Sequence, residues 1–527
     1  MCLAKGSSWL NLSCMFSGGI AYLLTMRKFK VRVYPSKEKL PKEKQLAWAL
    51  AELASHNIRA DVEAAEMVAN RIIDNASVAM AAINRKPVVA ARLQALAHPR
   101  TNGATLFGIS SDQMFECEWA AWANNVAVRE LDMHDTFLAA DYSHPGDTIP
   151  AILAVAQQKN KAGSDLLLGI LTAYEIQMNL VKGICLHEFK KDHIAHLTPA
   201  IAAGIGTLLK LDTETIFQAV NQSVHLSFST RQSRKGEISS WKAYVPGFAG
   251  KLAIEAVDRA MRGEKSPSPI YEGEDSVIAW MLGGKNTEYT IPLPEAGAPF
   301  QTILESYTKE HSAEYQAQAL IDIAFNLHKK KIDLSQIKEV VIYTSHHTHM
   351  VIGTGSQDPQ KFDPDASRET LDHSAMYIFA VALEDGAWHH EKSYSKERSH
   401  HLSTVELWKK IRTEMVKEWT DAYHHSDPSQ KKFGDEVVIT MKDGSQIRER
   451  LDNANAHPNG ARPFARPQYI QKFKTLSERA VTPKEQARFL QLAGEIPNLD
   501  AVKMRQLNVM ADKESLEGNK RDDKGIF

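Results

Sequence analysis

The chain has 527 residues, 43% of them hydrophobic, and its 63 Lys and Arg residues nearly balance its 64 Asp and Glu residues, giving a net charge of −1. This composition can fill a large core in more than one domain, and the lack of a basic excess argues against a nucleic-acid-binding protein. The four cysteines, Cys2, Cys14, Cys117 and Cys185, contain no CxxC pair. They predict neither a disulfide framework nor an iron–sulfur cluster, and they favour a reducing, cytoplasmic location.

The N-terminus carries an apolar run, residues 9–26, which is followed by the basic segment MRKFK. A secretory signal would place its positive charges before the apolar run, and a membrane anchor would be longer and less interrupted by polar residues. We therefore expect residues 1–28 to be an N-terminal extension outside the native protein, with Met26 as a candidate start. An anchor or targeting segment is the alternative, and no stable membrane association is expected.

The first half of the chain predicts an all-α domain over residues 29–269. Alanine-rich segments place apolar residues at helical spacing, and few alternating β-branched runs interrupt them. Helices are predicted over residues 42–56, 61–84, 115–130, 149–159, 164–180, 196–209, 213–225 and 248–262.

The composition changes after the Gly- and Pro-containing segment 263–269, and a smaller α+β domain is predicted over residues 270–460. The segment KEVVIYTSHHTHMVI alternates like a strand, and DEVVITMKDGSQIRERL predicts a hairpin around Asp443 and Gly444. Helices are expected over residues 313–330, 374–383, 405–416, 468–479 and 483–491, with C-terminal helices in 461–510. Residues 511–527 are charged and predict a flexible tail. The fold class is mainly α.

Residues 131–152, LDMHDTFLAADYSHPGDTIPAI, carry the strongest chemical signal. His134 and His144 are crowded with Asp132, Asp135 and Asp141 into an otherwise apolar stretch. This composition is typical of a site where protons are transferred. The turn at His144 leads into a predicted helix with Asp147 or Thr148 as N-cap, and a helix N-terminus favours anions such as carboxylates.

Two further segments offer candidates, each with a structural alternative. The segment KKDHIAH places His193 and His196 before a predicted helix, where they would otherwise be capping residues. Arg231, Arg234 and Lys235 form a basic cluster that could clamp carboxylates or lie on a solvated loop. The solvated-loop interpretation fits Lys242 less well than the other basic residues, because apolar residues flank it.

A third region brings Lys309 and His311 together before an amphipathic helix, and His373 precedes another apolar helix. The strand-like segment with His347 and His349 on one face suggests a metal site. No carboxylate or cysteine partner has suitable spacing, so surface histidines are the preferred interpretation.

Several of these segments resemble the MmgE/PrpD family, in family order over roughly residues 30–500. The resemblance is carried by HDTFLAADYSHPGD, KKDHIAHLTPAIAAGIGTLLKL, SWKAYVPGFAGKLA, SYTKEHSAEYQAQALIDIA, LDHSAMYIFAVALEDG and HPNGARPFARPQYIQKF. It implies a cofactor-independent, cytoplasmic, homodimeric hydro-lyase that converts 2-methylcitrate to 2-methyl-cis-aconitate in propionate catabolism, with citrate as a further substrate. It also implies that the C-terminal helices pack back on the helical domain.

The resemblance also implies site residues. His193 matches an active-site histidine, and Lys242 matches an active-site lysine that is followed at fixed spacing by Gly247. Dehydration needs a base, an acid and cations for the carboxylates, and His144 and Asp135 fit the first two demands by residue type. We expect no metal. The candidate catalytic residues are His144, Asp135, His193 and Lys242. The candidate substrate-binding residues are Arg231, Arg234, Lys235, Lys309, His311 and His373.

Two alternatives remain. The same family includes cis-aconitate decarboxylases and epimerases, although the segment around Lys309 differs in length and composition from the decarboxylase branch. A helical binding protein without turnover is an alternative of another class. The sequence does not decide which residue is the base and which is the acid.

Overall fold

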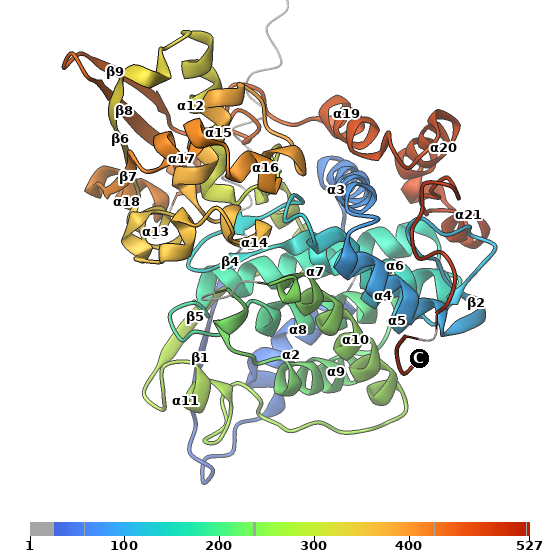
Figure 1. Cartoon of the computed structure of the whole chain (residues 1–527). Helices are drawn as coiled ribbons and strands as arrows, with labels where there is room; N and C mark the ends of the chain where they lie inside the picture. The colour runs from blue at the N-terminus through green and yellow to red at the C-terminus, as the bar shows by residue number, and fades with distance from the viewer. Residues whose placement is uncertain (1–25, 57, 235–238, 426, 523) are drawn as a thin grey trace, which may run out of the picture.

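The computed structural model describes residues 26–56, 58–234, 239–425, 427–522 and 524–527. The predicted N-terminal extension therefore lies, except for its last three residues, outside the described part. The fold is mainly α with a smaller sheet-containing part, as predicted. Figure 1 shows the helical part below and to the right of the sheet-containing part.

The predicted helices of the first half are confirmed, with one addition and one extension. Helix α4 is not predicted, because its apolar pattern is interrupted by the buried Arg92. Helix α10 starts at Trp241, ahead of the predicted residue 248, and continues through Pro246 and Gly247. A Cβ on Gly247 would lie 2.7 Å from Trp122 Cε3, so glycine here allows α10 to approach α5. The helices are α2 (Leu46–Ser55), α3 (Val62–Ala81), α4 (Lys86–Leu96), α5 (Cys117–Arg129), α6 (Ile149–Gln158), α7 (Gly163–Gly183), α8 (Ile194–Leu209), α9 (Thr213–Leu226) and α10 (Trp241–Met261).

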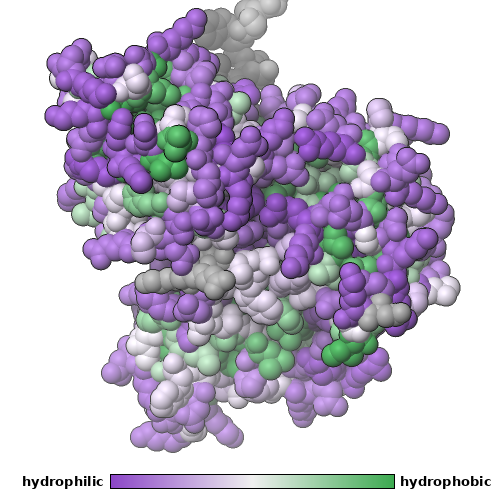
Figure 2. All heavy atoms as spheres, viewed as in Figure 1, coloured by the Kyte–Doolittle hydropathy of each residue, from purple (hydrophilic) through white to green (hydrophobic). Residues whose placement is uncertain are grey.

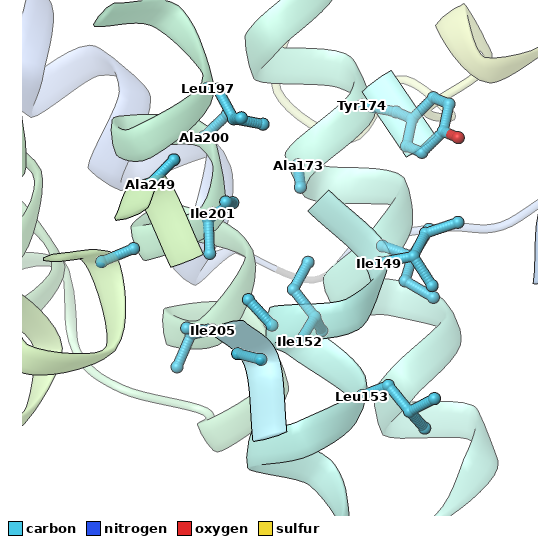
Figure 3. Close-up of a cluster of buried hydrophobic side chains, with 14 of the residues drawn as sticks. Ile149, Ile152, Leu153, Ala173, Tyr174, Leu197, Ala200, Ile201, Ile205 and Ala249 are labelled. Atoms are coloured by element: carbon cyan, nitrogen blue, oxygen red, sulfur yellow. The ribbon is translucent and has the colours of Figure 1, made fainter. Parts of the chain in front are cut away.

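The centre of the helical part is a tightly packed group of helices. Figure 3 shows Ile152 of α6, Ala173 of α7 and Ile201 of α8 lying side by side in this core. A Cβ on Gly204 would lie 2.6 Å from the Gly169 carbonyl oxygen, so two glycines let α7 and α8 come close together. Tyr174 also belongs to this buried group, and its hydroxyl points away from the other labelled side chains in Figure 3.

A four-stranded sheet forms the framework of the second part. Its strand order is β7–β6–β8–β9, with β6 parallel to β7 and antiparallel to β8. The predicted hairpin is confirmed, with Gly444 at φ 87° in the turn. The main elements are β6 (Ile337–Thr344), β7 (Ile411–Met415), β8 (Asp435–Met441), β9 (Gln446–Leu451), α12 (Gln318–Lys329) and α15 (Ala375–Asp385).

Two predictions in this part are wrong. The segment after β6 is helix α13 (His346–Val351), because Ser345 ends the strand and its hydroxyl accepts a hydrogen bond from the Thr348 N–H at 3.1 Å. His347 and His349 therefore do not share a strand face. The predicted helix 405–416 is also wrong in its second half. Helix α17 (Leu402–Trp408) ends at Trp408. Strand β7 follows, and its side chains are alternately buried and partly exposed, as in a strand.

The remaining elements are short or pair distant parts of the chain. The unpredicted strands β1 (Met26–Arg32) and β5 (Glu288–Pro294) pair antiparallel over their full length. The other elements are β2 (Pro99–Ala104), β3 (Phe137–Leu138), β4 (Tyr142–Ser143), α11 (Val277–Met281), α14 (Arg368–Leu371), α16 (Lys396–Ser399), α18 (Lys417–Tyr423), α19 (Arg466–Ser477), α20 (Pro483–Gly494) and α21 (Ala501–Arg505).

Buried hydrophobic side chains form two large clusters. The first combines residues 31–303 with residues 469–516, so Tyr469 and Phe473 of α19 share a cluster with the early helices. The second lies within residues 313–439. In the tail, the Arg92 guanidinium donates hydrogen bonds to the carbonyl oxygens of Glu517 and Gly518, the latter at 3.2 Å. The predicted domain boundaries and the flexibility of the tail stay predictions.

The surface in Figure 2 is mostly hydrophilic, with smaller hydrophobic patches over both the helical and the sheet-containing parts. Trp241, Phe248 and Met261 of α10 are among the exposed large hydrophobic side chains. Within the described ranges, no helix is both long enough and apolar enough to cross a membrane.

Candidate active site

The segment between α5 and α6 is buried. His134, Asp135 and His144 have relative exposures of 0%, 1% and 4%. The segment is therefore part of the core and not a surface loop. The backbone N–H groups of Thr136 and Tyr307 donate to each other's carbonyl oxygens at 2.9 and 2.7 Å, which ties the segment to the chain leading into the second part. A substitution that removes one of the buried hydrogen bonds here affects stability as well as chemistry.

The carboxylate of Asp135 is held from three sides. One oxygen accepts the Gly146 N–H at 2.8 Å, and the other accepts the Tyr174 hydroxyl at 2.9 Å and lies 3.4 Å from Arg71 Nε. A Cβ on Gly146 would lie 2.6 Å from Asp135 Oδ1, so only glycine fits at this close approach. This geometry favours a positioning role for Asp135 over the acid–base role expected from its residue type.

His144 is held as a neutral ring with one defined tautomer. Its Nδ1 lies 3.2 Å from the carbonyl oxygen of Asp135, and because a carbonyl only accepts, the ring proton belongs on Nδ1. Burial lowers the pKa of His144 well below 6.5, and the charges of Arg129 and Lys309 lower it further, although Asp132 opposes them. The Nε2 atom is therefore unprotonated.

Two more histidines flank His144 and share one carboxylate. Asp147 lies 2.9 Å from His134 Nε2 and 3.6 Å from His193 Nε2, and His193 Nδ1 lies 3.0 Å from Asp192 Oδ1. The rings of His134 and His193 lie 5.4 and 5.6 Å from that of His144. Burial would raise the pKa of Asp147, but the two histidines hold it below its usual value, so the carboxylate is charged.

The capping expectations are partly corrected. Asp147 lies in a 3-10 turn, Pro145–Thr148, and binds His134 instead of capping α6. Thr148 occupies the N-cap position of α6, but its hydroxyl donates to the Pro145 carbonyl at 2.7 Å and makes no cap hydrogen bond. His193 occupies the N-cap position of α8, which begins at Ile194. His196 contacts the Ile184 carbonyl through Nε2 at 3.1 Å.

A buried group of cations surrounds Asp132. Its carboxylate accepts from Arg129, lies 2.7 Å from Lys309 Nζ and lies 3.7 Å from Lys242 Nζ. Burial would raise the pKa of Asp132, but these three cations hold it well below 3.8. Three buried cations around one carboxylate form an electrostatic site for further anionic groups. We call the three cations Arg129, Lys242 and Lys309, together with the Asp132 that they surround, the cation cluster.

The cation cluster lies close enough to His144 that its charges shift the pKa of that ring. Asp132 has φ 50°, a left-handed conformation that is uncommon for residues other than glycine. Such strain persists where the surroundings enforce it and is frequent at functional sites.

The other candidate residues lie at different places. His373 Nδ1 contacts Asp372, whose carboxylate also binds Lys242 at 3.0 Å. Arg231 binds His187 and lies 5.3 Å above the ring of Tyr142, which is 6.2 Å from the ring of His144. The structure thus brings Lys309, Lys242, His193 and His144 into one region, with His373 and Arg231 at its edges.

One predicted residue, His311, is not brought into that region, and two others cannot be placed. His311 Nε2 lies 3.5 Å from Asp322 Oδ1, its ring packs against Phe325, and it contacts none of the residues around His144. The side chain of Arg234 and the whole of Lys235 lie outside the described residues. A surface hollow of about 450 Å³ lies elsewhere, beside the β8–β9 hairpin, and no candidate residue lines it.

The histidines of α13 are only partly at the surface, which corrects the surface-histidine interpretation. The ring of His347 lies 5.7 Å from that of His187 and stacks on Tyr423 at 5.1 Å, while His349 Nδ1 lies 2.7 Å from the Thr413 hydroxyl. Among the described residues, two groups have metal-ligand geometry: His389, His390 and Glu391, and Glu310, His311 and Asp322. Each group is a weak candidate for a metal site, because an arginine already binds one of its carboxylates. Arg479 binds Glu391, and Arg462 binds Glu310.

Sequence reasoning did not assign Arg129, the pairing of His134 with Asp147, or Asp372 to the site. Arg129 is the last residue of α5, two positions before the His- and Asp-rich segment, and that proximity was the only available signal. Asp372 stands beside the candidate His373, but its contact with Lys242 spans 130 residues. No local pattern reports such a contact.

Acid should destabilise the protein through its buried neutral histidines. Burial lowers the pKa of His187 and His196 to about 4 and that of His347 to about 3, from 6.5. The unfolded chain then binds protons that the folded chain does not, so the free energy of unfolding falls as the pH drops from about 6.5 toward about 4. The fully buried His196 alone corresponds to roughly 3 kcal/mol. Urea midpoints measured across this interval should fall steadily, and a flat profile would contradict these histidine environments.

Models of known families match most of the chain. The MmgE/PrpD N-terminal domain matches residues 44–290, and the MmgE/PrpD C-terminal domain matches residues 311–496. The mitochondrial 2-methylcitrate dehydratase of Yarrowia lipolytica is 26% identical over 363 residues, 66% of this chain and 67% of that protein. The 2-methylcitrate dehydratase of Salmonella typhi is 24% identical over 412 residues, 74% and 80% of the two chains. An alkylcitrate dehydratase from a fungal species is 21% identical over 351 residues, 63% and 67% of the two chains.

Proposed function

This chain belongs to the MmgE/PrpD family, and we propose that it is a hydro-lyase that converts 2-methylcitrate to 2-methyl-cis-aconitate in propionate catabolism. The names of its relatives support a dehydratase, at identities of 21–26%. The observation that carries the proposal is the neutral His144 beside the cation cluster. Citrate, which lacks only the methyl group, is a second proposed substrate.

The proposed reaction removes a proton from a carbon next to a carboxylate and hydroxide from the neighbouring carbon. The unprotonated Nε2 of His144 accepts the proton, and the electron pair of the broken C–H bond forms the double bond as the C–O bond breaks. Negative charge develops on the adjacent carboxylate, and Lys242, Lys309 and Arg129 stabilise it.

The departing hydroxide needs a proton and leaves as water. His193 is the proposed donor, because it lies between the carboxylates of Asp192 and Asp147 and its ring is 5.6 Å from that of His144. Asp135 fixes the turn at Gly146, and its carbonyl oxygen fixes the tautomer of His144. The three carboxylates of the substrate bind to the cation cluster, with Arg231 and His373 as further contacts.

The assay that tests this function uses purified protein with 2-methylcitrate and, separately, cis-aconitate. We expect ultraviolet absorbance of the conjugated enoate to rise with 2-methylcitrate and no CO2 to form from cis-aconitate. Release of CO2 would assign the decarboxylase branch of the family instead. No turnover of either compound, or of citrate, would favour a helical binding protein.

Activity should survive exhaustive chelation. The cation cluster supplies positive charge for the carboxylates from protein side chains, so a divalent ion is not needed for charge neutralisation. Turnover of 2-methylcitrate measured before and after dialysis against a strong chelator should agree within error. A loss of turnover that one added metal restores would contradict this expectation.

The homodimer and the cytoplasmic location implied by the family resemblance stay predictions. Light scattering of the purified chain tests the first, and cell fractionation tests the second.

A further inference from the structure

Asp372 joins the two parts of the molecule at the candidate site. It lies between α14 and α15, and its side chain is fully buried. One carboxylate oxygen lies 3.0 Å from Lys242 Nζ and 3.2 Å from Arg368, and the other contacts His373 Nδ1. Lys242 belongs to α10 of the helical part, so this carboxylate links the helical part to the sheet-containing part.

The carboxylate of Asp372 is charged. Burial would raise its pKa, but Lys242, His373 and Arg368 hold the pKa below its usual range. A buried charged group retains its ionisation only when its partners are well placed. Asp372 is therefore a fixed negative charge to which its neighbours are oriented.

The position of the Lys242 ammonium depends on Asp372. Its Nζ lies 3.0 Å from Asp372 and 3.7 Å from Asp132, so Asp372 is the nearer of the two carboxylates. Asp132 is already bound by Arg129 and by Lys309 at 2.7 Å. Because lysine is a point charge on a flexible chain, its nearer partner decides where the charge lies.

The orientation of His373 depends on the same carboxylate. A carboxylate only accepts, so a neutral His373 ring carries its proton on Nδ1 and its lone pair on Nε2. Burial lowers the pKa of His373, against the opposing effect of Asp372, so this ring is neutral. An aspartate that fixes the tautomer of a histidine is a known way to orient an acid–base group.

We propose that Asp372 is a positioning residue of this site: it places the Lys242 ammonium for a substrate carboxylate and fixes His373 with an unprotonated Nε2. The reference to a substrate carboxylate rests on the proposed function. The contact of Asp372 with Lys242 and the tautomer of His373 do not depend on the proposed function.

The binding test uses tricarballylate, a tricarboxylate without a hydroxyl group that therefore cannot lose water. In calorimetric titrations, Asp372→Asn should raise the Kd for tricarballylate at least tenfold, and its kcat for 2-methylcitrate should fall at least tenfold. The fitted stoichiometry reports the folded fraction, so a change in Kd is not a sign of partial unfolding. Asp365→Asn, which removes a 70%-exposed carboxylate bound to Lys396, is the matched control and should leave both values unchanged. An unchanged or lower Kd in Asp372→Asn would overturn the proposal.

A double-mutant cycle tests whether Asp372 acts through Lys242. Lys242→Ala and Asp372→Asn together should weaken tricarballylate binding by less than the product of their separate effects. If the rise in Kd of the double mutant equals the product of the two separate rises, Asp372 does not position this lysine. If Asp372→Asn does not fold, Asp372→Glu keeps the charge but displaces it, and a smaller rise in Kd is expected. A Kd unchanged in Asp372→Glu would also count against the proposal.

The wild-type protein offers a test that needs no turnover. In ¹⁵N-histidine NMR spectra, with the His373 signal assigned by its loss in His373→Asn, the proton should be on Nδ1. A proton on Nε2 would overturn the arrangement around Asp372. If the wild type neither binds tricarballylate nor dehydrates 2-methylcitrate, the proposed function fails, while the NMR result still decides for or against Asp372.

Discussion

Replacing His144 by asparagine should lower kcat for 2-methylcitrate by roughly 100-fold or more, the usual scale for losing a general base. The amide of asparagine can still donate to the Asp135 carbonyl that His144 Nδ1 now contacts at 3.2 Å, so the turn keeps its hydrogen bond. The expected result is an inactive protein with a melting temperature close to that of the wild type.

His144→Ala is the stricter version of this experiment. It removes the base and also leaves the buried Asp135 carbonyl without this donor, so its melting temperature should fall below that of His144→Asn. If both variants are stable and turn over normally, the proton is taken elsewhere, and His193 is the next candidate. If both melt far below the wild type, His144 has a structural role.

Replacing Lys242 by alanine should lower kcat/KM by roughly 100-fold or more, as expected for removing a preorganised charge from a buried site. Its 1%-exposed side chain is the cation that lies between Asp132 and Asp372, at 3.7 and 3.0 Å. Lys242→Arg should restore only part of the activity, because the guanidinium is larger and planar.

Helix α10 offers a matched control for this experiment. Lys251 is on the same helix but lies 3.3 Å above the ring of Trp119, away from the candidate site. Lys251→Ala should leave the kinetics of 2-methylcitrate turnover unchanged. Wild-type kinetics in Lys242→Ala would discard the assignment of Lys242, and a comparable loss in both variants would point to a general effect on α10.

The helical half of the fold could be predicted from sequence because its signal is local. Alanine-rich segments at helical spacing mark most of these helices to within a few residues. Strands β1 and β5 could not be predicted in this way, since each depends on a partner about 260 residues away. The helix His346–Val351 could not be predicted because it directly follows the strand-like run KEVVIYT, and only the cap at Ser345 distinguishes a helix from a continued strand.

The candidate site was predictable in part for the same reason. His144, His193, Lys242 and Lys309 stand in segments with distinctive residue types or a family resemblance, and the structure brings them together. The groups that orient them come from contacts between distant segments, such as Asp372 with Lys242. The positive φ of Asp132 likewise results from its surroundings.

The most direct test of this account is the NMR spectrum of 2-methylcitrate incubated with wild-type protein and, in parallel, with His144→Asn. The account predicts that the wild type forms 2-methyl-cis-aconitate and that the variant, although folded and able to bind tricarballylate, forms it at least about 100 times more slowly. Equal rates in the two samples, or a wild type that leaves 2-methylcitrate unchanged, would contradict it.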